Sequence, residues 1–92
     1  MSVPVSGRFE SGRVTITGVA TGYLDSSGVL DLVSSNGLSI KGNFVYVTRR
    51  EGQGTFVASD GRSGAFSFVS TGRRGTGVGN LGPDKITFTF GM

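Results

Sequence analysis

Apolar and polar residues alternate along most of the chain, and this alternation decides the fold class. In Ile86–Phe90, three apolar side chains fall on one face of an extended strand and two threonines fall on the other. Apolar residues do not recur with the 3.6-residue period of a helix, and the chain carries 17 glycines. Each glycine inside a helix costs roughly 1 kcal/mol relative to alanine. The sequence therefore predicts a single all-β domain over residues 1–92.

Turn signals divide the chain into eight predicted strands. The strongest are Asn36-Gly37 and Asp60-Gly61, since a tight or bulged hairpin turn needs the positive φ that glycine adopts easily. Connections this short pair consecutive strands antiparallel, as a meander. The second strand is long and contains Gly18 and Gly22, so we expect it to bend or to carry a bulge. The predicted strands are 3–9, 13–24, 28–34, 38–48, 54–59, 63–70, 75–81 and 85–90.

Most aromatic side chains fall on one face of this predicted sheet. Phenylalanine predominates and tryptophan is absent, which favours a buried core over an exposed platform for stacking bases or sugars. Each buried Phe contributes about 1.5–3 kcal/mol, so the sheet must cover this face. We expect the antiparallel meander to close as a small barrel or sandwich, or to be completed by dimerisation. The residues of this face are Phe44, Tyr46, Phe56, Phe66, Phe68, Phe88 and Phe90.

The glycines and aromatics of residues 36–81 resemble a known hairpin repeat. Gly52-x-Gly54-Thr55-Phe56, then Asp60-Gly61, then Gly64-x-Phe66, is similar to the MORN repeat. Two features depart from that repeat: Ser63 stands where a tyrosine is usual, and no tryptophan follows the glycine. The chain also resembles short Gly- and Thr-rich bacterial envelope proteins. These resemblances imply a scaffold or attachment module of an envelope or a larger assembly, without catalytic residues.

The composition excludes most catalytic and metal chemistry. The chain has no Cys and no His, which removes thiolate nucleophiles, zinc–thiolate sites and the commonest proton shuttle. Lys41 and Lys85 do not stand in a Ser-x-x-Lys motif, and five of the six carboxylates fall in or beside turns. The sixth, Asp31, falls on the outer face of a strand. Gly75–Asn80 misses the last position of a dinucleotide fingerprint. We therefore expect no enzyme, no cofactor and no metal site.

Two arginine pairs form the candidate binding site. The net charge is +3, and Arg49-Arg50 recurs 24 residues later as Arg73-Arg74. An even number of turns separates the pairs, so Arg49, Arg50, Arg73 and Arg74 fall at one end of the meander. Strands lie about 4.8 Å apart, which puts the pairs roughly 10 Å apart. They are candidate anion-binding residues for phosphate or carboxylate groups, unless they only solubilise that end.

The function predicted from these features is a non-catalytic structural or interaction module that associates with itself, as a homo-oligomer, or with a protein partner. The alternative is an anion-binding protein whose arginines contact nucleic acid or phospholipid headgroups. No run of 18 apolar residues exists, so we expect no transmembrane segment. Met1–Val5 lacks the basic and apolar regions of a signal peptide. A cytoplasmic protein and a mature secreted or periplasmic domain without its signal both stay open.

Overall fold

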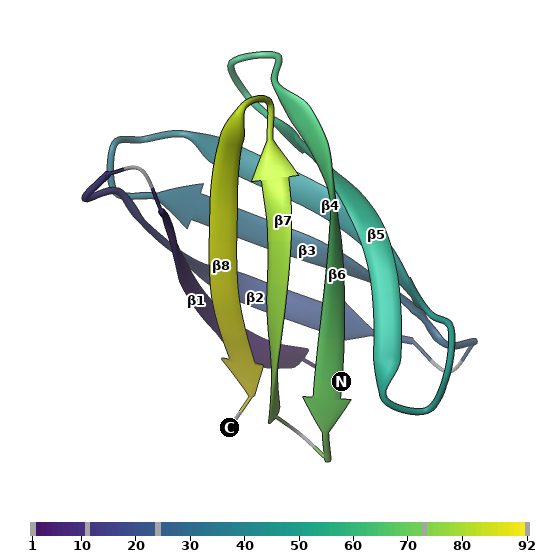
Figure 1. The fold of residues 1–92 in the computed structure, drawn as a ribbon. Helices are drawn as coiled ribbons and strands as arrows, with labels where there is room; N and C mark the ends of the chain where they lie inside the picture. The colour runs from purple at the N-terminus through teal and green to yellow at the C-terminus, as the bar shows by residue number, and fades with distance from the viewer. Residues whose placement is uncertain (1, 11, 24, 73, 92) are drawn as a thin grey trace.

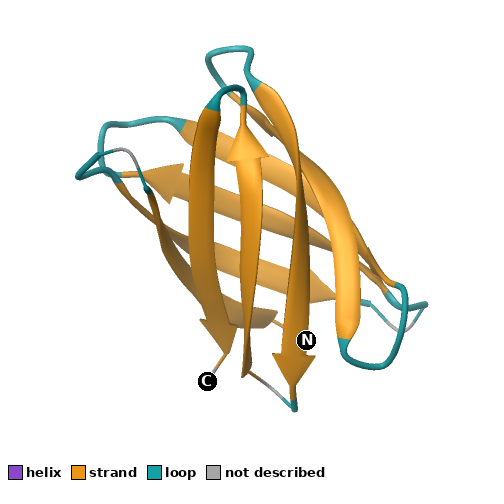
Figure 2. Ribbon diagram, viewed as in Figure 1, coloured by secondary structure: helices purple, strands orange, loops and turns teal. Residues whose placement is uncertain are grey.

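The chain folds into a closed barrel of eight antiparallel strands. The computed structural model describes residues 2–10, 12–23, 25–72 and 74–91, which form strands and short connections (Figures 1 and 2). Each strand pairs with the next, and β8 pairs with β1. The predicted all-β meander is confirmed, and closure as a barrel is the way its aromatic face is covered. The strands are β1 (Ser2–Phe9), β2 (Thr15–Gly22), β3 (Ser27–Ser34), β4 (Ser39–Tyr46), β5 (Glu51–Ala58), β6 (Ser63–Thr71), β7 (Arg74–Leu81) and β8 (Asp84–Gly91).

Closure removes one argument for self-association. The aromatic face lies inside one chain, so no second copy is needed to cover it. Homo-oligomerisation stays a prediction without that support. Among the described residues there is also no helix with the length and hydropathy needed to cross a membrane.

Strand β2 is shorter and more regular than predicted. It spans Thr15–Gly22 rather than 13–24, and its pairs with β1 and β3 run without interruption, so the expected bulge is absent. A Cβ atom at Gly18 would lie 2.1 Å from the carbonyl oxygen of Asp31. Gly18 therefore serves the close approach of two strands and does not interrupt the ladder.

The turns at Gly37 and Gly61 have the predicted positive φ, at 91° and 93°. The N–H of Gly37 donates to the carbonyl of Ser34 at 3.0 Å, and the Gly61 turn repeats this bond. Asn36 and Asp60 are not among the described residues with positive φ. Both turns are therefore three-residue loops with a bulged glycine, and not the two-residue type I′ form.

Inward-facing side chains divide the barrel into two halves. One end is formed by the β1–β2, β3–β4, β5–β6 and β7–β8 connections, and we call it the closed end. The other is formed by the remaining connections and both chain ends, and we call it the open end (Figure 1). The largest side chains with less than 2% exposure all lie in the closed half: Ile16, Ile40, Phe56, Leu81 and Ile86.

Arg62 covers the closed end of the barrel. Its Nε lies 2.7 Å from Asp60 Oδ2, its Nη1 contacts Asp84, and its guanidinium carbon lies 5.8 Å from the centre of the Phe9 ring. The hydrogen bond to the Asp60 side chain raises the pKa of Arg62. The backbone N–H of Arg62, followed by its side chain, lowers the pKa of Asp60. Arg62, paired with two carboxylates and lying over the ring of Phe9, thus covers this end of the interior.

Candidate functional site

The open half of the barrel contains a cavity of about 580 Å³. This volume falls within the roughly 300–1,000 Å³ typical of small-molecule sites. Among the described residues, the side chains that line it are aliphatic or aromatic, and their only polar groups are the hydroxyls of Tyr23 and Tyr46. The lining residues are Val3, Val5, Ala20, Gly22, Tyr23, Leu30, Phe44, Tyr46, Phe66, Phe68, Gly72, Phe88 and Phe90.

The cavity exists because phenylalanine rings lie against the barrel wall, over glycines of neighbouring strands. Gly28 on β3 pairs with Phe44 on β4, and Gly52 on β5 pairs with Phe68 on β6. A Cβ atom at Gly28 would lie 2.2 Å from Cζ of Phe44, and one at Gly52 would lie 2.3 Å from Cζ of Phe68. Each ring thus fills the place of its neighbour's missing side chain. The centre of this half stays empty.

Strands β7 and β8 repeat this arrangement. Gly75 pairs with Phe90 and Gly77 pairs with Phe88. Cβ atoms at these glycines would lie 2.3 Å and 2.2 Å from Cζ of the paired rings. Glycine–aromatic pairs therefore line both sides of the cavity.

Contacts between rings hold the aromatic lining in place. The ring of Phe68 lies edge-on to those of Phe44, Tyr46 and Phe90, with centres 5.4, 5.3 and 5.6 Å apart. Such contacts contribute about 0.5–1.5 kcal/mol each beyond the burial of surface. The wall of the cavity is thus formed before any ligand arrives.

The cavity reaches the surface at the open end. Tyr23, in the β2–β3 connection, is 55% exposed, and Tyr46 is half-buried beside the inner rings. The β2–β3 connection is held by Asp25, whose Oδ1 accepts hydrogen bonds from the hydroxyl and the N–H of Ser27 at 2.5 and 3.1 Å. These bonds, the one from the hydroxyl first, lower the pKa of Asp25. This carboxylate is therefore already engaged within its own connection.

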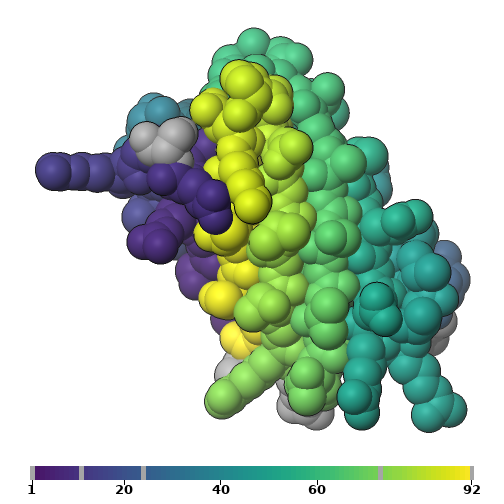
Figure 3. Space-filling model, viewed as in Figure 1, coloured from purple at the N-terminus to yellow at the C-terminus, as the bar shows by residue number. Residues whose placement is uncertain are grey.

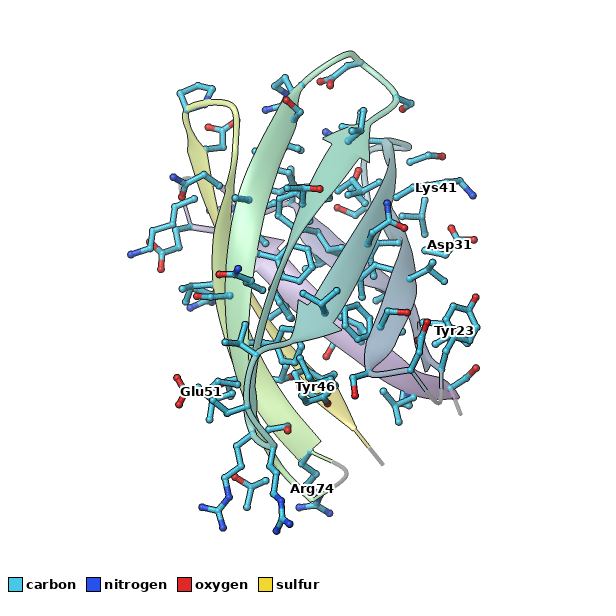
Figure 4. All side chains as sticks on the ribbon, turned by 90° about the vertical axis from the view of Figure 1, so that its right-hand side faces the viewer. Tyr23, Asp31, Lys41, Tyr46, Glu51 and Arg74 are labelled. Atoms are coloured by element: carbon cyan, nitrogen blue, oxygen red, sulfur yellow. The ribbon has the colours of Figure 1, made fainter. Side chains whose placement is uncertain are left out.

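Three of the four predicted anion-binding arginines lie at the open end. Arg49 and Arg50 belong to the β4–β5 connection, Arg74 begins β7, and all three are exposed. Arg73 lies outside the described residues. Figure 4 shows Arg74 at the rim below Tyr46, and Figure 3 shows long side chains projecting from this end of the molecule. Arg49 and Arg50 thus lie at the end of the barrel where the cavity opens, whereas Arg74 faces outward from β7 and lines a shallow groove on the outer wall with Pro4, Ser6 and Thr89.

Hydrogen bonds fix the β4–β5 connection that carries Arg49 and Arg50. The N–H groups of Arg50 and Glu51 donate to Thr48 Oγ1 at 3.2 and 3.0 Å. The carbonyl of Arg50 accepts the N–H of Ser70, on β6, at 2.6 Å. The backbone of the connection is therefore tied to the barrel wall at Arg50.

The acidic side chains that the structure describes do not gather as metal ligands. Among residues 2–10, 12–23, 25–72 and 74–91, no three His, Cys, Asp or Glu side chains gather. Asp31 lies on the outer wall as predicted, and its Oδ2 is 3.3 Å from Nζ of Lys41, with both side chains exposed (Figure 4).

Sequence analysis identified most aromatic residues of the interior but missed buried Phe9 and the cavity. Phe56 packs in the closed half, whereas the other six predicted aromatics line the cavity. The signal that could have found the cavity is a small inward residue near the open end of five strands: Gly22, Gly28, Gly52, Ser70 and Gly75.

Comparisons with known proteins identify structures with the same fold but assign the chain to no family. No family model and no curated protein matches the chain. Among solved structures, a redesigned β-barrel, mFAP1, bound to DFHBI has a TM-score of 0.79 and 15% identity, over 99% of this chain and 92% of that one. EF1p2_mFAP2b bound to DFHBI has a TM-score of 0.75 and 11% identity, over 98% and 90%. A third structure, a de novo designed fluorescence-activating β-barrel, has a TM-score of 0.71 and 13% identity, over 98% and 89%.

The resemblance to MORN repeats and to envelope proteins is therefore wrong. Residues 36–81 run from the β3–β4 connection to the end of β7 in a closed barrel, and the similar structures are designed barrels. Two of the glycines that suggested the repeat are sites where rings from the next strand lie, whereas Gly61 is a turn residue and Gly64 lies against the backbone of Asn80. Gly52 accommodates the ring of Phe68, and Gly54 that of Phe66. Packing inside a barrel thus accounts for the pattern.

Proposed function

We propose that this protein is a non-catalytic binding protein that takes one small, largely apolar molecule into the cavity of the open half. The cavity of about 580 Å³, apolar and open at one end, carries this proposal. Water inside it has few polar partners, so a ligand that displaces the water gains free energy. Two designed barrels of this fold are bound to a small molecule, DFHBI, which supports the proposal.

The cavity lining favours binding over catalysis. Its polar side-chain groups are the hydroxyls of Tyr23 and Tyr46, and the nearby carboxylate of Asp25 is held by Ser27. Acid–base and nucleophilic catalysis need a nucleophile or proton acceptor next to a second group that activates or orients it. The lining residues that the structure describes offer no such pair. Association with an envelope, an assembly or a partner protein stays a prediction.

Titration with N-phenyl-1-naphthylamine tests this function. The probe is uncharged, and its fluorescence rises in apolar surroundings. We expect saturable binding of one probe per chain. We also expect the free energy of unfolding to rise with probe concentration, by about 2.7 kcal/mol at a hundred times the Kd.

Two neighbouring residues of β2 supply a variant and its control. Ala20 lines the cavity, whereas Val19 faces outward and is 44% exposed. Ala20→Phe is expected to weaken probe binding at least about tenfold, because the added ring occupies the cavity. Val19→Phe is expected to leave binding unchanged. Equal effects of the two substitutions, or no saturable binding by the wild-type chain, would contradict the proposed function.

A further inference from the structure

We propose that the ligand of this cavity is an amphipathic anion. Its apolar body lies among the aromatic rings, and its acidic group, a carboxylate, sulfonate or phosphate, lies at the rim beside Arg49 and Arg50. This inference rests on the proposed function of the cavity. It adds the charge of the ligand and the direction in which the ligand enters.

The charges at the open end favour an anion at the rim. The acidic side chains nearest to these arginines in the fold are those of Asp25 and Glu51. Asp25 accepts two hydrogen bonds from Ser27. Glu51 pairs in register with Val69, and its side chain lies on the outer wall, away from Tyr46 (Figure 4). The carboxylate of Asp25 is therefore engaged within its own connection, and that of Glu51 points away from the cavity.

At the closed end, the cation that covers the interior is already paired. This cation, Arg62, contacts the carboxylates of Asp60 and Asp84 and covers the ring of Phe9. An anion at that end would have to displace these partners. Large side chains also fill the interior behind Arg62. A ligand with one charged end therefore fits only with its apolar part toward the closed end.

The tyrosines mark the boundary between the two parts of such a ligand. The half-buried ring of Tyr46 contacts Phe68 on its inner side, 5.3 Å between centres, while Tyr23 is exposed at the opening. Each offers one hydroxyl at a cavity that is otherwise apolar. Beyond them, guanidinium groups give planar acids paired, charge-assisted hydrogen bonds. The hydrogen bond from the N–H of Arg50 to Thr48 holds the rim in position for this contact.

A matched pair of probes tests the inference. 8-Anilino-1-naphthalenesulfonate has the rings of N-phenyl-1-naphthylamine plus one sulfonate. Arg49→Gln/Arg50→Gln is expected to weaken binding of the sulfonate about fivefold to tenfold and to leave binding of the neutral probe unchanged. Arg8→Gln/Arg13→Gln removes the same charge from exposed residues toward the closed end, so we expect it to change neither affinity appreciably. The effect at Arg49 and Arg50 should shrink toward 1 M NaCl, where the Debye length is about 3 Å.

The outcomes separate this inference from the proposed function. If the wild-type chain does not bind the neutral probe, the proposed function is wrong and the inference falls with it. If both probes bind and Arg49→Gln/Arg50→Gln leaves both affinities unchanged, only the inference is overturned. If Arg49→Gln/Arg50→Gln and Arg8→Gln/Arg13→Gln weaken sulfonate binding equally, the effect comes from net charge. This result also overturns the inference. Duplex DNA that displaces the sulfonate but not the neutral probe would assign the arginines to a polyanion instead.

Discussion

The closed and open halves of the barrel are built from the same eight strands, yet only one of them is filled. In the closed half, side chains such as Phe56 and Leu81 are 1% and 0% exposed. In the open half, Tyr46 and Phe90 are only partly buried and surround a cavity of about 580 Å³. In one small barrel, the closed half can therefore supply the packed core while the open half leaves room for a ligand. Strand pairing supports both halves equally, and inward side chains decide which half is hollow.

Phe66 marks the border between the halves. Its ring stacks on Phe56 of the closed half, with centres 4.9 Å apart, and it also lines the cavity. Toward the open end, the rings of Phe68 and Phe90 lie over Gly52 and Gly75 on the barrel wall and contact each other edge-on. The change from interlocked rings to rings against the wall therefore occurs within one strand length.

The largest predicted effect compares one ring from each half. Phe56→Ala is expected to lower the free energy of unfolding by about 3–5 kcal/mol, because it leaves an enclosed void. Phe90→Ala is expected to cost less than about 2 kcal/mol, because its ring is half-buried and its space joins an existing cavity. Urea unfolding of both variants measures the difference. Equal losses would mean that the open half contributes to stability as much as the closed half.

A second prediction fills the open half from the wall. A Cβ atom at Gly77 would lie 2.2 Å from Cζ of Phe88, and its three nearest atoms all belong to that ring. Gly77→Ala should therefore push the ring into the cavity. It is expected to weaken probe binding about tenfold and to cost about 1–3 kcal/mol of stability.

The control for Gly77 is a glycine whose neighbour cannot move. A Cβ atom at Gly18 would meet the backbone carbonyl of Asp31 at 2.1 Å. Gly18→Ala should destabilise the barrel more than Gly77→Ala, while the folded fraction keeps its affinity for the probe. Unchanged affinity in Gly77→Ala would show that the ring does not enter the cavity.

Much of the fold could be predicted, because the patterns that indicate strands and turns are local. The cavity could not be predicted, because it depends on contacts between strands. The alternation at Ile86–Phe90 and the turn at Asn36-Gly37 indicate strands and connections without reference to distant residues. Barrel closure depends on β1 meeting β8, as in the pair of Val5 with Phe90, and alternation does not say which edges meet. Counting turns placed the arginines at one end. The hollow interior depends on where rings such as that of Phe68 lie, which is set by a neighbouring strand.

A third prediction compares the stability lost when a turn glycine is replaced at each end of the barrel. Gly61 at the closed end and Gly72 at the open end both have positive φ, 93° and 66°, and open space where a Cβ atom would lie. Alanine at either site should cost about 1 kcal/mol through backbone strain alone. Gly12→Ala, also in open space and without a positive φ in that range, should be neutral. Unequal losses at Gly61 and Gly72, measured by thermal unfolding, would show that packing of the halves extends into their turns.

The smallest predicted effect concerns acid, and it compares one aspartate from each end. The pKa of Asp60 is held below its ordinary value of 3.8 by the N–H of Arg62 and then by its guanidinium group. The pKa of Asp25 is lowered by the hydroxyl and N–H of Ser27. As the pH falls, each of these carboxylates is therefore protonated at a higher pH in the unfolded chain than in the folded one. The stabilisation is therefore present above the unfolded pKa and is lost as the pH falls through the folded pKa, between roughly pH 5 and pH 2.

Asp60→Asn and Asp25→Asn should each make the free energy of unfolding fall less between pH 6 and pH 3. Urea unfolding at pH 6, 4 and 3 measures this fall. The contribution of Asp60 includes attraction to a cation, whereas that of Asp25 comes from uncharged donors. Added NaCl should therefore reduce the effect of Asp60→Asn more than that of Asp25→Asn. If salt changes both effects equally, the charge of Arg62 adds nothing to the closed end, and the ring of Phe9 beneath it is held by packing alone.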